Sequence, residues 1–123
     1  MRWLPAFAVL LALLLSGCHD DFSYSVSINT MAESGTVTTG QAVGLSVHFT
    51  TDNTSVSIDS DDWQVVSSPG SYTLTDFGRS ADLTPAVAGT YVVRYRVWFW
   101  TDWGDYIYKE SFVTVQAVTA FAG

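Results

Sequence analysis

The chain has 123 residues, which is enough for one domain. Its formal net charge is −7 and only 14% of its residues are charged, so it lacks the basic surface by which proteins bind DNA or RNA. Hydrophobic residues make up 48% of the chain and aromatic residues 15%, which is too much apolar surface for a disordered protein. A single cysteine excludes an internal disulfide and a zinc site built from paired cysteines.

The first seventeen residues are typical of a secretory signal peptide. Arg2 precedes an apolar run from Phe7 to Leu15, and small residues follow. The run is too short to cross a hydrocarbon core of roughly 30 Å comfortably, so we expect residues 1–17 to be cleaved. Two alternative interpretations assign no role to Cys18. The segment is either an ordinary signal peptide followed by a chance cysteine, or a buried core helix with the same apolar run.

The junction Leu15-Ser16-Gly17-Cys18 resembles the lipobox of bacterial lipoproteins. That resemblance implies cleavage before Cys18 and attachment of a diacylglyceryl group to its sulfur. Two or three acyl chains, at about 0.8 kcal/mol per buried CH₂ group, hold a protein firmly on a bilayer. In the family's sorting rules an Asp directly after the cysteine favours the inner membrane, and His19 in that place implies the outer membrane. Residues 18–21 are then the lipidated N-terminus and a short tether.

Alternation of apolar and polar residues predicts a series of short strands beyond the tether. The alternation covers residues 22–28 and 43–50, and shorter segments follow at 56–58, 63–66, 72–74 and 81–83. The acidic stretch 59–62 is predicted to be a turn. The two longest segments, 91–100 and 106–115, flank a turn at 101–105 and predict a large hairpin.

These segments predict an all-β domain. Short strands separated by turns every eight to twelve residues are typical of a two-sheet antiparallel sandwich of about seven strands. No segment beyond the signal peptide carries an uninterrupted helical period. We place the sandwich at residues 22–117 and a C-terminal tail at 118–123, either frayed or lying along a sheet edge.

Four motifs follow one another between residues 63 and 97: Trp63, Ser68-Pro69-Gly70-Ser71, Leu83-Thr84-Pro85 and Ala88-Gly89-Thr90-Tyr91. Together they resemble bacterial PKD-type domains of the immunoglobulin-like superfamily. The resemblance implies that Trp63 fills the space between the sheets and that the Tyr91 hydroxyl returns to the preceding corner. Gln64-Val65-Val66 departs from the acidic, glycine-rich turn of the commoner PKD pattern. Such modules usually serve as spacers, adhesion units or ligand-binding appendages, which implies interaction rather than chemistry.

No combination of nucleophile, base and acid satisfies the requirements of a catalytic site, so we expect neither enzymatic activity nor a cofactor. His48 alternates onto the polar face of its strand, where a lone histidine is usually solvated. Asp59, Asp61 and Asp62 are weak candidates for a calcium site because Ca²⁺ prefers oxygen ligands. A solvated acidic turn explains the same residues.

Aromatic residues are dense in the predicted hairpin. Alternation places Trp98 and Trp100 on the strand face opposite Tyr91, and Trp103 at the turn beyond the sheet. Exposed Trp and Arg dominate binding interfaces, and flat indoles also stack on sugars. The alternative is that cross-strand aromatic pairs and stacked guanidinium groups only stabilise the hairpin. The predicted ligand-binding residues are Arg94, Arg96, Trp98, Trp100, Trp103 and Tyr106.

The sequence thus predicts a lipid-anchored protein of the cell envelope, in the outer membrane, that binds a ligand without catalysis. The expected ligand is an envelope or surface protein or a glycan, and contact with the anchoring membrane is a third use of the same surface. The alternative function is regulation or inhibition of a cell-envelope enzyme, with the hairpin around Trp103 acting as a plug.

Overall fold

The computed structural model describes residues 23–119, so the predicted signal peptide, Cys18 and most of the predicted tail lie outside the described residues. Within residues 23–119 no helix is long and apolar enough to cross a membrane. The described residues form eight strands: β1 (Ser25–Ala32), β2 (Thr36–Thr38), β3 (Val43–Asp52), β4 (Val56–Ser67), β5 (Tyr72–Asp76), β6 (Ser80–Pro85), β7 (Gly89–Thr101) and β8 (Tyr106–Val118).

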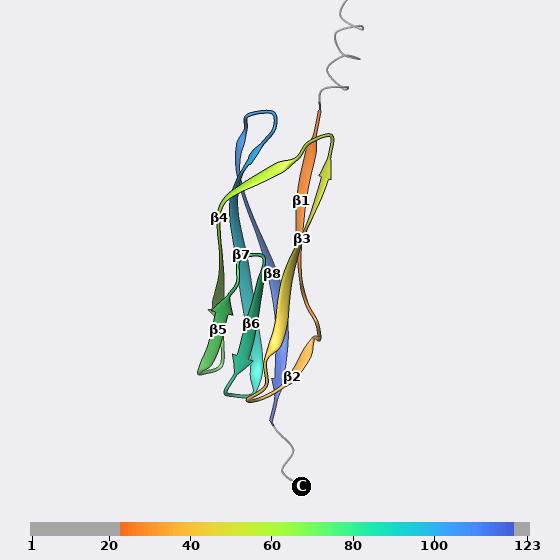
Figure 1. The fold of residues 1–123 in the computed structure, drawn as a ribbon. Helices are drawn as coiled ribbons and strands as arrows, with labels where there is room; N and C mark the ends of the chain where they lie inside the picture. Colours follow the sequence, from red (N-terminus) through yellow and green to blue (C-terminus); the bar gives the residue numbers. More distant parts are fainter. Residues whose placement is uncertain (1–22, 120–123) are drawn as a thin grey trace, which may run out of the picture.

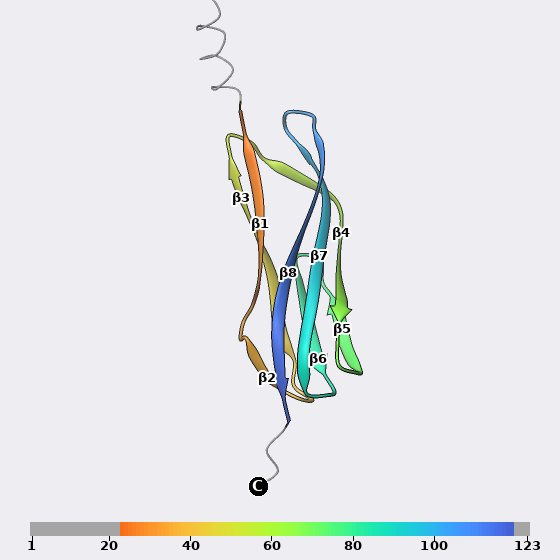
Figure 2. The same cartoon turned by 180° about the vertical axis from the view of Figure 1, so that it is seen from behind.

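The strands form two sheets that pack face to face (Figures 1 and 2). The first sheet has the order β1-β3-β6-β5 and the second has the order β2-β8-β7-β4. All neighbouring strands are antiparallel except β2 and β8. The prediction of an all-β, two-sheet sandwich is confirmed.

The core lies between the sheets, and β7 contributes most to it. Every second residue of β7 from Tyr91 to Phe99 is fully buried, because β7 lies between β8 and β4 and turns one face toward the first sheet. The Phe49 ring of β3 packs edge-on against Tyr95 and Phe99, with centroid distances of 6.5 and 6.2 Å. The predicted two-residue period of this segment is confirmed.

Trp63 and Tyr91, the two predicted core residues, are both buried. The Trp63 indole packs against the Tyr95 ring at 4.8 Å, and its Nε1 donates a hydrogen bond to the Gly78 carbonyl at 2.8 Å. The Tyr91 hydroxyl donates to the Val87 carbonyl oxygen at 2.7 Å, at the corner that precedes β7. Both side chains therefore occupy the places that the motifs predict.

Three details of the strand prediction are wrong. Asp59 to Asp62 do not form a turn but belong to β4, whose pairing with β7 passes two bulges without ending. The three-residue strand β2 was missed because so short a segment shows no alternation; it pairs with the end of β8. β8 continues beyond its predicted end at Val115 to Val118, and Val118 pairs with Thr38 of β2, in agreement with the alternative that the tail begins along a sheet edge.

Gly89 opens β7 with a backbone conformation that only glycine adopts easily. Its φ is +139°, and a Cβ atom built there would lie 2.7 Å from Pro69 Cγ. Gly89→Ala is expected to lower the free energy of unfolding by about 2.5 kcal/mol, since it combines backbone strain with overpacking. Urea denaturation measures the loss. Gly35→Ala is the matched control, because a Cβ atom at Gly35 meets nothing within 4 Å.

A variant pair tests this explanation. Pro69→Ala in the Gly89→Ala background removes the collision but leaves the backbone strain, so it should restore part of the lost stability. Equal stability of Gly89→Ala and the unsubstituted protein would contradict the prediction.

Candidate binding surface

Four aromatic side chains lie together on the face of the second sheet that points away from the core. They are Trp98 and Trp100 of β7 and Tyr106 and Tyr108 of β8, and we call them the outer aromatic face. The hairpin register places Trp98 opposite Tyr108 and Trp100 opposite Tyr106. The ring centroids are 5.0 and 4.7 Å apart in these two pairs. Side-chain alternation thus brings together rings that the chain separates by the turn at 102–105.

The outer aromatic face is open to solvent. Trp100 and Tyr106 each keep 48% of their surface exposed, and Tyr108 keeps 45%. Trp98 is half-buried beneath its neighbours, and the Arg96 guanidinium lies 5.3 Å from the centre of its ring. The predicted exposure of Trp98 and Trp100 opposite the core face therefore agrees with the structure, with Trp98 as the covered member of the group.

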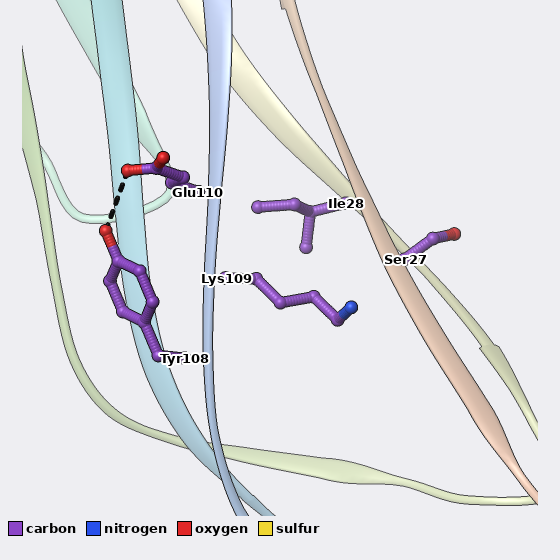
Figure 3. Close-up of a pocket in the computed structure, with 5 residues that line it drawn as sticks. All are labelled: Ser27, Ile28, Tyr108, Lys109 and Glu110. Atoms are coloured by element: carbon purple, nitrogen blue, oxygen red, sulfur yellow. Dashed lines mark hydrogen bonds between the residues drawn. The ribbon is translucent and has the colours of Figure 1, made fainter.

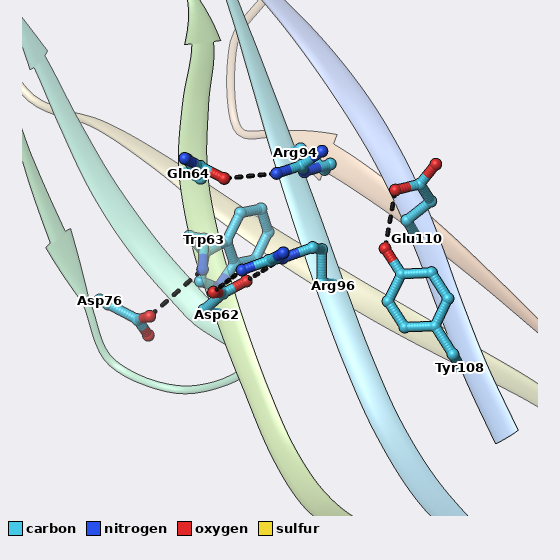
Figure 4. A network of polar contacts seen from close by, with 8 residues as sticks. All are labelled: Asp62, Trp63, Gln64, Asp76, Arg94, Arg96, Tyr108 and Glu110. Atoms are coloured by element: carbon cyan, nitrogen blue, oxygen red, sulfur yellow. Dashed lines mark hydrogen bonds and ion pairs between the residues drawn. The ribbon is translucent and has the colours of Figure 1, made fainter.

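Polar side chains of β4 and β7 form a row on the same face (Figure 4). The Arg96 guanidinium binds both carboxylate oxygens of Asp62 on β4, with Nε 2.9 Å from Oδ1. This hydrogen bond is the main reason that the pKa of Asp62 is lowered. Arg94, two residues earlier, donates from Nη2 to the Gln64 side-chain oxygen. The cross-strand bonds fix the orientation of both arginines on β7.

The two tyrosines of the face also donate hydrogen bonds to carboxylates. The Tyr106 hydroxyl donates to Asp59 on β4, and the Tyr108 hydroxyl donates to Glu110, each at 2.8 Å. These bonds raise the pKa of both phenols above their ordinary value, so both hydroxyls are protonated near neutral pH. The tyrosine hydroxyls are therefore held in place and their rings remain partly open.

Trp103 lies at the hairpin turn, beyond the paired part of the sheet, as predicted. Its indole Nε1 donates to the Asn53 carbonyl oxygen at 3.0 Å, and its ring packs against Tyr24 at 5.3 Å. The Tyr24 hydroxyl donates to Asp105 of the same turn, which raises the pKa of Tyr24. Trp103 thus joins the turn to the β3–β4 loop and the start of β1. Because these contacts hold Trp103 against its own domain, they do not support the alternative in which the hairpin around Trp103 inserts into an enzyme as a plug.

The three aspartates predicted as a weak calcium site point in different directions. Asp61 accepts a hydrogen bond from the Tyr95 hydroxyl at 2.8 Å on the core side of β4, whereas Asp59 and Asp62 contact the outer aromatic face and its polar row. Asp61 and Asp62 separate because successive side chains of a strand alternate between its faces, and the register shift between Ile58 and Ser60 leaves Asp59 on the outer side with Asp62. No group of three or more potential metal ligands occurs in the part of the chain between residues 23 and 119. The calcium hypothesis is therefore not supported.

Several members of the surface were not among the predicted binding residues. Tyr108 and Glu110 of β8 share the face of Tyr106 by the same alternation that identified Trp98 and Trp100, and Phe112 follows them with 51% exposure. Asp62 and Gln64 were missed because their role depends on the pairing of β4 with β7. His48 lies exposed on β3, in the first sheet, apart from this surface.

No protein-family model matches this chain, and the search of curated proteins finds no similar sequence.

Proposed function

We propose that this protein is a lipid-anchored envelope lipoprotein whose single domain binds a protein or glycan ligand through the outer aromatic face. The proposal combines the signal peptide and lipobox at Cys18 with the exposed rings on the second sheet. The ligand stays bound without chemical change, since the residues of the face are hydrogen-bonded in pairs and offer no nucleophile with an adjacent base.

The strand order supports an immunoglobulin-like type within the all-β class. Sheets of the form ABED and CFG define the constant-type immunoglobulin sandwich, and the orders β1-β3-β6-β5 and β8-β7-β4 have the same pattern. The Tyr91 hydroxyl at the corner before β7 corresponds to the tyrosine corner of that fold. We therefore propose a PKD-type immunoglobulin-like domain, consistent with the motifs between residues 63 and 97.

The main observation in support of the binding proposal is that the rings of Trp100, Tyr106 and Tyr108 are exposed together in one patch. A cross-strand aromatic pair contributes roughly 0.2–1 kcal/mol to a hairpin, whereas each buried side chain of β7 contributes roughly 1.5–3 kcal/mol. The buried face of β7 already secures the strand with five fully buried residues. Stabilisation of the hairpin is thus a minor gain from the outer rings. Exposed aromatic patches of this kind mark interaction sites.

Trp100→Ala tests the proposal directly. We expect this variant to reduce ligand capture at least tenfold, because a stacking indole near the centre of an interface contributes much of its affinity. The free energy of unfolding should change by less than about 1 kcal/mol, since the side chain is half exposed. The measurement is co-sedimentation with purified peptidoglycan sacculi and, in parallel, crosslinked co-purification from membranes.

Phe77→Ala is the matched control for this experiment. Phe77 is a large aromatic residue with 61% exposure, and it lies between β5 and β6 of the first sheet, away from the outer aromatic face. Sedimentation with sacculi identifies a glycan ligand, whereas a single crosslinked partner identifies a protein. Capture that is the same for the unsubstituted protein and Trp100→Ala in both assays would contradict the proposal.

A further inference from the structure

The outer edge of β8 has no strand partner over most of its length. β2 pairs only with Gln116 to Val118, and no other strand of the described residues pairs with β8 on the side away from β7. The opposite edge of the second sheet, β4, is interrupted by two bulges, a feature that discourages strand addition. The segment from Tyr106 to Glu110 thus leaves backbone groups on an open edge, which ends at Ser111, where the side chain is hydrogen-bonded to Thr30 of β1.

A groove of about 390 Å³ lies beside this edge, between β8 and β1. Its lining residues are Ser27, Ile28, Tyr108, Lys109 and Glu110. Figure 3 shows the Lys109 side chain extending from β8 toward β1, and the Ile28 side chain extending from β1 toward β8. One wall is therefore apolar, and the space ahead of the strand edge contains an ammonium group.

Lys109 is the only lysine of the chain, and it faces the inner side of β8. Its side chain is partly buried. Glu110 points to the outer face, where its carboxylate accepts a hydrogen bond from the Tyr108 hydroxyl. No carboxylate of residues 23–119 lies within ion-pair distance of the Lys109 ammonium. An ammonium group in an open groove remains hydrated, and a strand that fills the groove offsets the loss of this hydration if it brings a partner of opposite charge.

We propose that the free edge of β8 binds an extended segment of a partner protein as an added strand, with an inward carboxylate of that segment paired to Lys109. Main-chain hydrogen bonds along Tyr106 to Glu110 supply affinity, as in other cases of strand addition. Lys109 supplies selectivity, because an incoming strand with only apolar inward side chains would leave the ammonium unpaired. Pairing with a second copy is opposed by the net charge of −7.

The groove is a second surface beyond the outer aromatic face, because it lies at the edge of β8 toward β1 and shares only Tyr108 with that face. Its ligand in this proposal is an acidic extended peptide.

The experiment uses the full-length protein in detergent and a fluorescent, end-blocked peptide, Thr-Val-Thr-Glu-Thr-Val-Thr, with a Gln-for-Glu peptide as its control. Fluorescence anisotropy should show binding of the Glu peptide about tenfold tighter than binding of the Gln peptide, the difference that a charge-assisted bond contributes. Lys109→Met should make the two affinities equal, and Lys109→Arg should restore the preference. Added NaCl should weaken only the binding of the Glu peptide.

Three results would overturn the proposal: no binding of the Glu peptide at millimolar concentration, a preference for Glu that persists in Lys109→Met, or affinities for both peptides that do not depend on salt. Self-association of Lys109→Met, without peptide binding by the unsubstituted protein, would show that Lys109 only prevents edge-to-edge pairing. Trp100→Ala should bind the Glu peptide as the unsubstituted protein does, so this experiment and the capture experiment on the outer aromatic face can fail independently.

Discussion

Replacing Cys18 with serine is expected to move the protein from the membrane fraction to the soluble fraction. Two or three acyl chains contribute about 0.8 kcal/mol per buried CH₂ group, and nothing else in the acidic chain attracts it to anionic lipid. The measurement is fractionation of cells, together with incorporation of an alkyne-labelled fatty acid. Unsubstituted protein should carry the label in the membrane fraction, and Cys18→Ser should carry none.

Ser16→Ala is the matched control, because it keeps a small residue at the cleavage junction. It should behave as the unsubstituted protein does. Membrane association of Cys18→Ser without label would show that residues 1–17 act as an uncleaved anchor, and an unlabelled, soluble unsubstituted protein would show an ordinary signal peptide. The second result would remove the lipoprotein proposal, whereas the first would not if the unsubstituted protein carries the label; the binding proposal is judged by its own test.

An anchor at Cys18 would determine which end of the sandwich faces the membrane. The described chain begins at Ser23, and five residues of extended chain reach at most about 18 Å. The start of β1 and the β7–β8 turn lie at the same end of the domain, and the end of β8 lies at the other (Figure 1). The packed pair of Tyr24 and Trp103 would then lie nearest the lipid.

Charge opposes deep contact of that end with the membrane. Asp102 and Asp105 belong to the hairpin turn, and a hydrogen bond from the Thr54 hydroxyl lowers the pKa of Asp102, which keeps its carboxylate ionised. Carboxylates are repelled by anionic headgroups. If Cys18 carries the anchor, we therefore expect the domain to stand off the surface, with the outer aromatic face running along its side and accessible to ligands.

Much of β7 could be predicted because its burial alternates strictly. A central strand with one face in the core repeats its pattern every second residue, and this local signal requires no knowledge of its partners. The same signal placed Trp98 and Trp100 on the outer side. It also gave the correct turn position for Trp103, although not its contact with Asn53, which is 50 residues away in the chain.

The acidic part of β4 shows where local reasoning fails. Asp59, Asp61 and Asp62 have the composition of a turn, yet each accepts a hydrogen bond from a side chain of β7 or β8 in the same sheet. The partners are separated from them by 34 to 47 residues. Turn propensity is a weak preference, and strand pairing with β7 outweighs it once those bonds form. Only the topology shows that these residues support the binding surface.

The Trp63 side chain connects the two sheets, and its removal is expected to have the largest effect on stability. Trp63→Ala should lower the free energy of unfolding by about 4 kcal/mol, because it leaves a cavity beside Tyr95 and an unpaired Gly78 carbonyl. The melting temperature should fall by roughly 20 °C. Trp63→Phe keeps most of the ring and loses only the indole hydrogen bond, so its cost should be about half as large.

Ligand capture should respond differently to this substitution. Asp62 and Gln64 flank Trp63 in sequence but point to the opposite side of β4, where they hold Arg96 and Arg94. Well below its melting temperature, Trp63→Ala should therefore capture ligand as the unsubstituted protein does, whereas Trp100→Ala keeps its stability and loses capture. Calorimetry and co-sedimentation of the two variants measure the contrast. Loss of capture by folded Trp63→Ala would mean that the binding surface depends on the core beneath it, and that the outer rings alone do not define it.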